Sequence, residues 1–119
     1  MPTKQSLIQS VLEASGANVY YIYPACWSDA PVISWRESDN RCFRRADGME
    51  FLTELSYVVD VWAKNPADAA ALAQDVDTRM TAAKFKRSFM TDLFEKSSRY
   101  YHRNIHYRCI VDSQGNMYQ

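Results

Sequence analysis

Residues 51–64, FLTELSYVVDVWAK, alternate between apolar and polar side chains, and this alternation is the strongest constraint on the fold. Successive residues of a β-strand point to opposite faces of a sheet. The apolar series on one face would be Leu55, Tyr57, Val59 and Val61. The mostly polar series on the other face would be Glu54, Ser56, Val58, Asp60 and Trp62. The pattern predicts a sheet with one packed face and one face left to water or to a partner.

Two segments have the helical spacing needed to cover the packed face. Residues 4–15 carry an apolar stripe, and Gly16 follows as a helix-ending residue. That stripe consists of Leu7, Ile8, Val11 and Leu12. The second helix begins with Asn65 as N-cap, Pro66 at the first position and Asp68 in the first turn. Its stripe consists of Ala69, Leu72, Ala73, Val76 and Met80.

The rest of the chain contains shorter segments with strand character. A short strand that ends before Pro24 is predicted within the stretch 18–27. Further strands are predicted at 31–36, 85–95 and 99–111, the last two joined by Lys96-Ser97-Ser98. Pro24 and Pro31 favour edge positions for the first two of these strands. The polar segment 37–50, which contains Asp47-Gly48, predicts a loop or a protruding hairpin.

Together these elements predict an α+β two-layer sandwich, with a mostly antiparallel sheet and two helices packed on one face. The 119 residues are enough for a single domain, 1–119, and the short polar end at 113–119 is expected to be loose.

Charge and cysteine content limit the function classes. Fourteen basic and fourteen acidic residues give zero net charge, which argues against a protein that wraps nucleic acid and favours association. Cys26, Cys42 and Cys109 form no C-x-x-C pair, so reduced thiols in a cytosol are expected. The chain has neither a signal-peptide pattern at its start nor an apolar run near the ~20 residues of a membrane span. A soluble protein without membrane contact is expected.

The candidate reactive residues do not form a catalytic pattern. His102 and His106 lie in a predicted strand, where four residues span roughly 13 Å, too far to share one metal. Asp75 and Asp77 are expected to be solvated charges on different sides of a helix. A cysteine–histidine nucleophile has no supporting sequence context, and no glycine-rich phosphate loop is present. The sequence therefore predicts no enzyme, no cofactor and no metal site.

The second face of the sheet is the best candidate for an interface. Trp62 lies opposite the packed stripe, so it is expected in a contact with a partner rather than in the monomer core. Residues 85–95 add apolar side chains that are expected to share a face with Lys86 and Asp92. The predicted oligomer or partner interface consists of Trp62, Val58, Asp60, Met90 and Phe94.

Arginines gather between residues 36 and 45. Arg36, Arg41, Arg44 and Arg45, with Phe43, could bind phosphates or an acidic protein surface. The alternative is a solvated loop in which the arginines pair with the acids nearby, Glu37, Asp39, Asp47 and Glu50.

Several short motifs occur in a characteristic order. They are Pro-x-Ile-Ser at 31–34, Glu-x-x-Tyr-x-Val-Asp-Val-Trp-Ala-Lys at 54–64, an acidic amphipathic helix, Phe-x-Arg at 85–87 and Tyr-Tyr-His-Arg at 100–103. Over residues 5–112 the chain resembles the small tail-completion proteins of tailed bacteriophages, the tail terminator or tail-to-head joining proteins of long-tailed phages and prophages. One departure is Lys84, where such proteins often have glycine before the phenylalanine. The helix exit is therefore expected to use another geometry.

The resemblance implies a structural virion protein at the head–tail interface, assembled in the host cytoplasm. Copies of the chain would form a homo-hexameric ring that caps the tail tube, ends its polymerisation and meets the head-completion or connector protein. DNA would only pass through the ring lumen. Arg41, Arg44, Arg45 and Phe43 would contact the neighbouring ring. Two alternatives remain, a head-closure or neck adaptor protein and a small nucleic-acid- or peptide-binding module.

Overall fold

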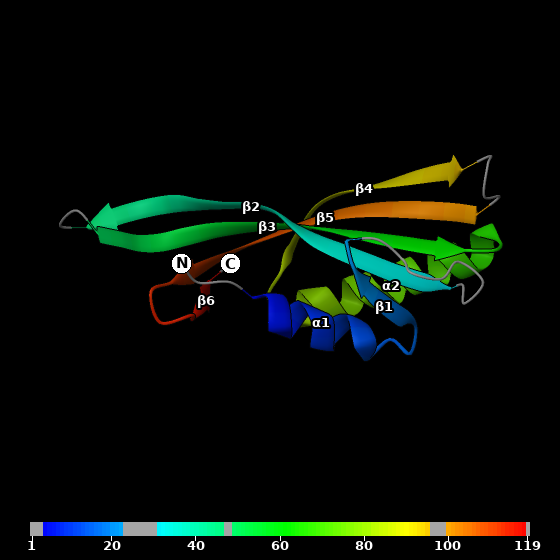
Figure 1. The fold of residues 1–119 in the computed structure, drawn as a ribbon, viewed down its shortest axis with the longest axis horizontal. Helices are drawn as coiled ribbons and strands as arrows, with labels where there is room; N and C mark the ends of the chain where they lie inside the picture. The colour runs from blue at the N-terminus through cyan, green and yellow to red at the C-terminus, as the bar shows by residue number, and fades with distance from the viewer. Residues whose placement is uncertain (1–3, 23–30, 47–48, 96–99, 119) are drawn as a thin grey trace.

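A computed structural model describes residues 4–22, 31–46, 49–95 and 100–118, which form two helices and a mixed six-stranded sheet (Figure 1). The helices are α1 (Gln5–Glu13) and α2 (Pro66–Ala82). The strands are β1 (Asn18–Tyr21), β2 (Val32–Ala46), β3 (Met49–Ala63), β4 (Lys86–Glu95), β5 (Tyr100–Asp112) and β6 (Met117–Tyr118).

The sheet has the order β1-β2-β3-β5-β4, and β6 pairs with the far end of β5. β1 runs parallel to β2, whereas every other described pairing is antiparallel. β1 lies at an edge, as its proline predicts, but β2 lies between β1 and β3 over residues 32–35, so the edge prediction for that strand is wrong. The strand predicted to end before Pro24 is β1, and residues 23–30 lie outside the described residues.

The core lies between the helices and one face of the sheet, and both helices lie on that same side (Figure 1). The predicted packed stripe of β3 is fully buried there, and so are Ile8 and Leu12 of α1 and Val76 and Met80 of α2. The Nε1–H of Trp35 also donates to Oε1 of Gln9 at 2.6 Å, which fixes α1 against β2. The face assignment for β3 and both helices is therefore confirmed.

Of the two alternatives predicted for residues 37–50, a loop or a protruding hairpin, the structure has the hairpin, which is longer than these residues. β2 and β3 each span 15 residues and pair from Val32↔Trp62 to Ala46↔Met49. The outer half of this hairpin extends away from the helices (Figure 1), and the molecule measures 52 × 25 × 23 Å. We call residues 37–54 of this hairpin the arm. Neither of the described helices packs on the arm (Figure 1), so its strands do not need the apolar alternation that identifies half-buried strands.

Within the C-terminal segment expected to be loose, the described residues form a turn and the short strand β6. The carboxylate of Asp112 accepts hydrogen bonds from the backbone N–H groups of Asn116 and Gln114 and from the hydroxyl of Tyr118. These bonds, with the backbone bond from Asn116 foremost, lower the pKa of Asp112. An aspartate can close a turn in this way, and the turn returns β6 to β5.

The end of α2 shows why the Lys84 departure has little effect on the fold. Lys84 has φ +74°, the left-handed conformation that glycine usually supplies. The N–H of Phe85 donates to the carbonyl of Met80, and the N–H of Lys84 donates to that of Thr81, both at 3.0 Å. These two bonds form a Schellman motif, and Phe85 and Met80 meet in the core. The expectation of another exit geometry is therefore wrong.

Lys84→Gly is expected to stabilise the protein by roughly 0.5–1 kcal/mol, because glycine adopts positive φ without the steric cost that lysine carries. Chemical denaturation measures this change. Ala83→Gly is the matched control, since Ala83 has φ −86° and its replacement should destabilise the protein. A lower free energy of unfolding for Lys84→Gly would contradict the argument.

Candidate functional site

The face of the sheet opposite the helices is built from rows of side chains that the strand register places side by side, and we call it the helix-free face. Each row takes one residue each from β2, β3 and β5, and its fourth residue from β4 or β6. The rows are Val32-Trp62-His102-Leu93, Ser34-Asp60-Asn104-Thr91, Arg36-Val58-His106-Phe89, Asp39-Ser56-Arg108-Lys86 and Arg41-Glu54-Ile110-Tyr118. The last two rows lie where the arm joins the rest of the sheet.

A polar network occupies the centre of this face. Oδ1 of Asp60 accepts from Nδ2 of Asn104 at 2.7 Å and lies 2.6 Å from Nε2 of His102. A carboxylate only accepts, so Nε2 of His102 carries the donated proton. Oδ1 of Asn104 in turn lies 2.7 Å from Nε2 of His106. Asp60 and Asn104 thus link two histidines that the sequence places four residues apart.

Each histidine of the network also stacks on an aromatic ring. The rings of His102 and Trp62 lie 4.5 Å apart, and those of His106 and Phe89 lie 4.0 Å apart. Burial lowers the pKa of His106; Asp60 opposes this effect and Arg36 adds to it. His106 is therefore held in its neutral form to lower pH than an exposed histidine.

Trp62 and Val58 lie on the predicted face but are not exposed. Trp62 is 4 % exposed and Val58 is 1 % exposed, so the expectation that Trp62 lies outside the folded monomer is wrong. Alternation in the sequence shows which face a side chain occupies, but neighbouring strands decide how far that side chain is covered. The role of Trp62, Val58 and Asp60 in an interface remains a prediction.

A β-bulge changes the predicted faces of β4. The register shifts between Arg87 and Phe89, so Lys86 lies on the helix-free face whereas Met90 packs against the core on the helix side. Nη1 of Arg103 contacts Sδ of Met90 at 3.4 Å there. The prediction that Lys86 and Met90 share a face is therefore wrong. The side chain of Phe94 lies outside what the structure describes.

The bulge also exposes two apolar side chains that the sequence analysis missed. Phe89 is 49 % exposed and Leu93 is 46 % exposed, and both lie on the helix-free face. A strict period of two assigns them to the face of Arg87, and one extra residue in the strand reverses that assignment. Their apolar character was visible in the sequence, but the position of the bulge was not.

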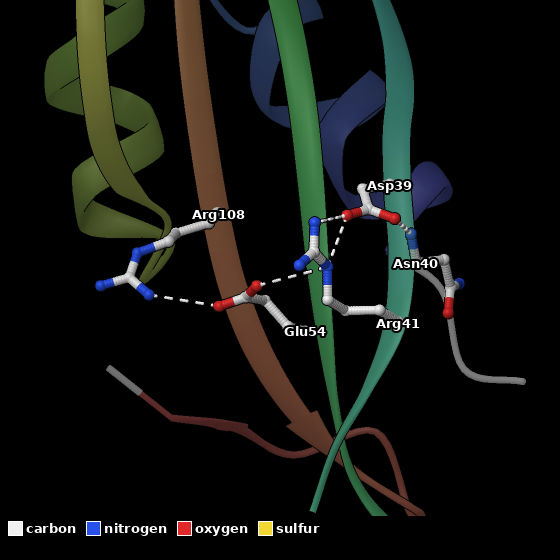
Figure 2. A network of polar contacts seen from close by, with 5 residues as sticks. All are labelled: Asp39, Asn40, Arg41, Glu54 and Arg108. Carbon is white, nitrogen blue, oxygen red and sulfur yellow. Dashed lines mark hydrogen bonds and ion pairs between the residues drawn. The ribbon is translucent and has the colours of Figure 1, made fainter.

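The predicted loop residues Arg41, Phe43, Arg44 and Arg45 all lie in β2, so they belong to a strand of the arm. Arg41 pairs with Asp39 and lies 3.8 Å from Glu54, which also pairs with Arg108 at 3.2 Å (Figure 2). The charges of two arginines and two carboxylates therefore compensate one another where the arm begins.

Arg44 differs from Arg41 because it is exposed and has no ion pair with any residue that the structure describes. Its guanidinium lies 4.5 Å from the ring centre of Phe43. The side chain of Arg45 is not among the described ones. The alternative of a self-paired basic segment thus holds for Asp39, whereas Glu37 accepts from the hydroxyl of Tyr57 at 2.8 Å. Asp47 and the side chain of Glu50, the other two acids of that alternative, lie outside what the structure describes.

The acids of α2 have different surroundings. Asp75 pairs with Arg79 at the surface, which agrees with the expected solvated charge. Asp77 accepts from the hydroxyl of Tyr107 at 2.9 Å and pairs with Arg87 at 3.1 Å. Burial, first, and the bond to Asp77 raise the pKa of Tyr107. Asp77 therefore connects α2 to the sheet, and the expectation that it is only solvated is wrong.

The described residues offer little chemistry. Cys109 is buried, and burial raises its pKa to about 12, so its thiol is a poor nucleophile. Cys42 is half-buried, and Cys26 lies outside the described residues. In the described ranges no group of three or more histidines, cysteines and carboxylates is placed to hold a metal ion. None of the described helices is long and apolar enough to cross a membrane.

Comparison with known proteins adds no assignment. No family model matches the chain, and no curated protein matches it.

His106 is expected to titrate below its ordinary pKa of 6.5 in an NMR titration of its ring protons. A lowered folded-state pKa favours the neutral form, so this contribution to stability is present above pH ~6.5 and is lost as the pH falls through the folded-state pKa. Arg36→Gln should raise the pKa of His106, whereas Arg41→Gln is a matched control that should leave it unchanged. A His106 pKa at or above 6.5 would contradict this interpretation.

Trp62→Ala is expected to reduce the free energy of unfolding by about 3–5 kcal/mol, because it removes a buried ring that stacks on His102. Thermal or chemical denaturation of dilute protein measures the loss. Leu93→Ala, at a half-exposed position of the same row, should change stability much less. Equal effects of the two substitutions would show that Trp62 is not part of the monomer fold.

Proposed function

We propose that the chain is a structural subunit of a phage virion, a tail terminator that forms a homo-hexameric ring at the head–tail interface. In this proposal the fold is a two-layer α+β sandwich. The ring caps the tail tube, ends its polymerisation and presents a surface to the head-completion or connector protein. DNA passes through the lumen, and the protein has no catalytic role.

The observation that carries the proposal is the shape of the subunit. One small core leaves a sheet face and a projecting arm that the described helices do not cover. The sheet has helices on one face only, and its other face exposes Phe89 and Leu93. The arm extends beyond the helices to one end of a molecule 52 Å long (Figure 1). A closed ring needs two different complementary surfaces on each subunit, and an elongated chain with a projecting arm offers them.

The motifs behind the resemblance have distinct places in the fold, which also supports the proposal. Tyr57 of the 54–64 motif is buried in the core, and Asp60 of the same motif centres the polar network. Lys84 adopts the left-handed conformation at the position where the resembling proteins often have glycine. Lysine at this position therefore keeps the left-handed helix exit that glycine usually supplies.

One observation favours the nucleic-acid-binding alternative. Phe89 is exposed on a sheet face one row from Lys86 and Arg108, and an exposed aromatic ring beside cations can stack a nucleobase. Zero net charge argues against strong binding of this kind. The head-closure or neck adaptor alternative shares the ring and differs in the partner that the ring meets.

Mass photometry of the concentrated chain is expected to show a species of about six times the 13.8 kDa monomer mass, independent of added DNA. Negative-stain images should show rings at one end of purified tail tubes, and tube growth should stop when the chain is added. A chain that stays monomeric at every concentration contradicts the proposal. Oligonucleotide binding with a steep salt dependence would instead support the nucleic-acid-binding module.

A further inference from the structure

A small cavity lies at one edge of β5, between the two strands that pair with that edge. Lys86, the first residue of β4, pairs with Arg108, and Tyr118 of β6 pairs with Ile110. Cys109 lies between these two pairs and has no partner on this edge among the described strands. The cavity has a volume of about 30 Å³ and is lined by Lys84, Lys86, Arg108, Cys109, Ile110 and Tyr118.

Three of the lining residues are cationic, and they come from three different parts of the chain. Lys84 follows α2, Lys86 begins β4 and Arg108 belongs to β5. Like charges that converge on one cavity repel one another, and an anion between them reverses the sign of the interaction. The lining of this cavity is therefore suited to a negatively charged group.

The described carboxylates do not compensate all three cations. Nη1 of Arg108 pairs with Glu54 at 3.2 Å (Figure 2), and Glu54 also lies near Arg41. An arginine has five N–H donors, so Arg108 keeps donors for a ligand. Neither Lys84 nor Lys86 has an ion pair with a residue that the structure describes.

The other acids are either held elsewhere or too far away. The carboxylate of Asp112 accepts hydrogen bonds within its own turn and from the hydroxyl of Tyr118. The acids whose side chains are not described are Asp29, Asp47, Glu50 and Glu95. The described backbone nearest to each of these in the chain lies at least four residues along its strand from both rows that border the cavity, roughly 13 Å or more. They are too far for an ion pair with Lys86.

The backbone of Lys84 points to the same site independently. Lys84 has φ +74°, a conformation that glycine adopts without the steric cost that lysine carries. Residues held in such unfavourable conformations cluster at functional sites, where the surrounding structure maintains them. Here the strained residue adds a cation to the lining of the cavity, which glycine could not do.

We propose that the cavity binds one compact oxyanion of the phosphate or sulfate class, held by Lys84, Lys86 and Arg108. The volume has room for roughly two water molecules, which suits one such group and excludes a nucleobase. A doubly charged anion fits three converging cations better than a carboxylate does, because a carboxylate carries one charge. The inference goes beyond the proposed ring, since every residue of the site belongs to one copy of the chain.

Titration of dilute protein with inorganic phosphate at about pH 8, at ionic strength held constant with sodium chloride, tests the site. Saturable shifts of the amide signals of Lys86, Cys109 and Ile110 are expected in ¹H–¹⁵N NMR spectra. Sulfate should give the same pattern and acetate a weaker one. Lys86→Gln should weaken phosphate binding about tenfold, because it removes a charged donor.

Lys64→Gln is the matched control, because Lys64 is an exposed lysine that directly follows β3. This variant should bind phosphate within about twofold of wild type. Circular dichroism should show that both variants are folded.

Thermal unfolding gives a second measurement of the site. Phosphate at about ten times its Kd should raise the wild-type unfolding midpoint by roughly 5 °C. Lys84→Gly lacks one of the cations, so phosphate should raise its midpoint by less than half as much. Lys84→Arg keeps the charge and should keep most of the phosphate effect.

The outcomes separate this inference from the proposed function. Folded wild-type protein without saturable phosphate binding overturns the site and leaves the proposed ring standing. Equal losses in Lys86→Gln and Lys64→Gln also overturn it, since the binding then reflects general surface charge. Tighter binding of a single-stranded oligothymidylate than of inorganic phosphate, at equal concentration of phosphate groups, assigns the site to nucleic acid and overturns the compact ion. Absence of rings contradicts the proposed function alone, because these measurements use dilute protein.

Discussion

The burial of one face of β3 under α1 and α2 is the constraint on which the rest of the structure depends. Tyr57, Val59 and Val61 lie in one buried cluster with Ile8 and Leu12 of α1 and Val76 and Met80 of α2. Once this face is buried, the opposite side chains must lie on the helix-free face. The side chains of the polar network and its stacked rings lie on the helix-free face for this reason, whereas the exposed residues of β4 also depend on the bulge between Arg87 and Phe89.

Side chains on the helix-free face partly shield one another from solvent. Asp60 holds His102 and Asn104, and the stacked ring of Trp62 lies within the same layer. Buried polar groups are stable when each finds a partner, and here the partners come from adjacent strands. Trp62 therefore belongs to the monomer fold, and Phe89 and Leu93 of β4 are large apolar side chains that stay exposed on this face.

In the arm, arginines that lie close together in the sequence differ in their ion pairs. Arg41 and Arg44 are three residues apart, yet Arg41 lies between two carboxylates whereas Arg44 has no ion pair with a residue that the structure describes. The strand register, with shifts at Glu37/Asp39 and Cys42/Arg44, decides this difference. The arginines of this one segment therefore differ in their described surroundings.

The sequence by itself determined both helices, the packed stripe of β3 and the β4–β5 hairpin, because apolar periodicity reports directly which side chains leave water. It also placed Asp60 and Trp62 on the face opposite the packed stripe of β3. It did not determine the length of β2, since strands of the arm face no helix and lack the alternation that marks burial. The tertiary structure alone decided the faces of Lys86, Phe89 and Met90, because a bulge inserts one residue without a sequence signal. It also decided that Trp62 is buried, because the side chains beside it belong to strands that are distant in the sequence.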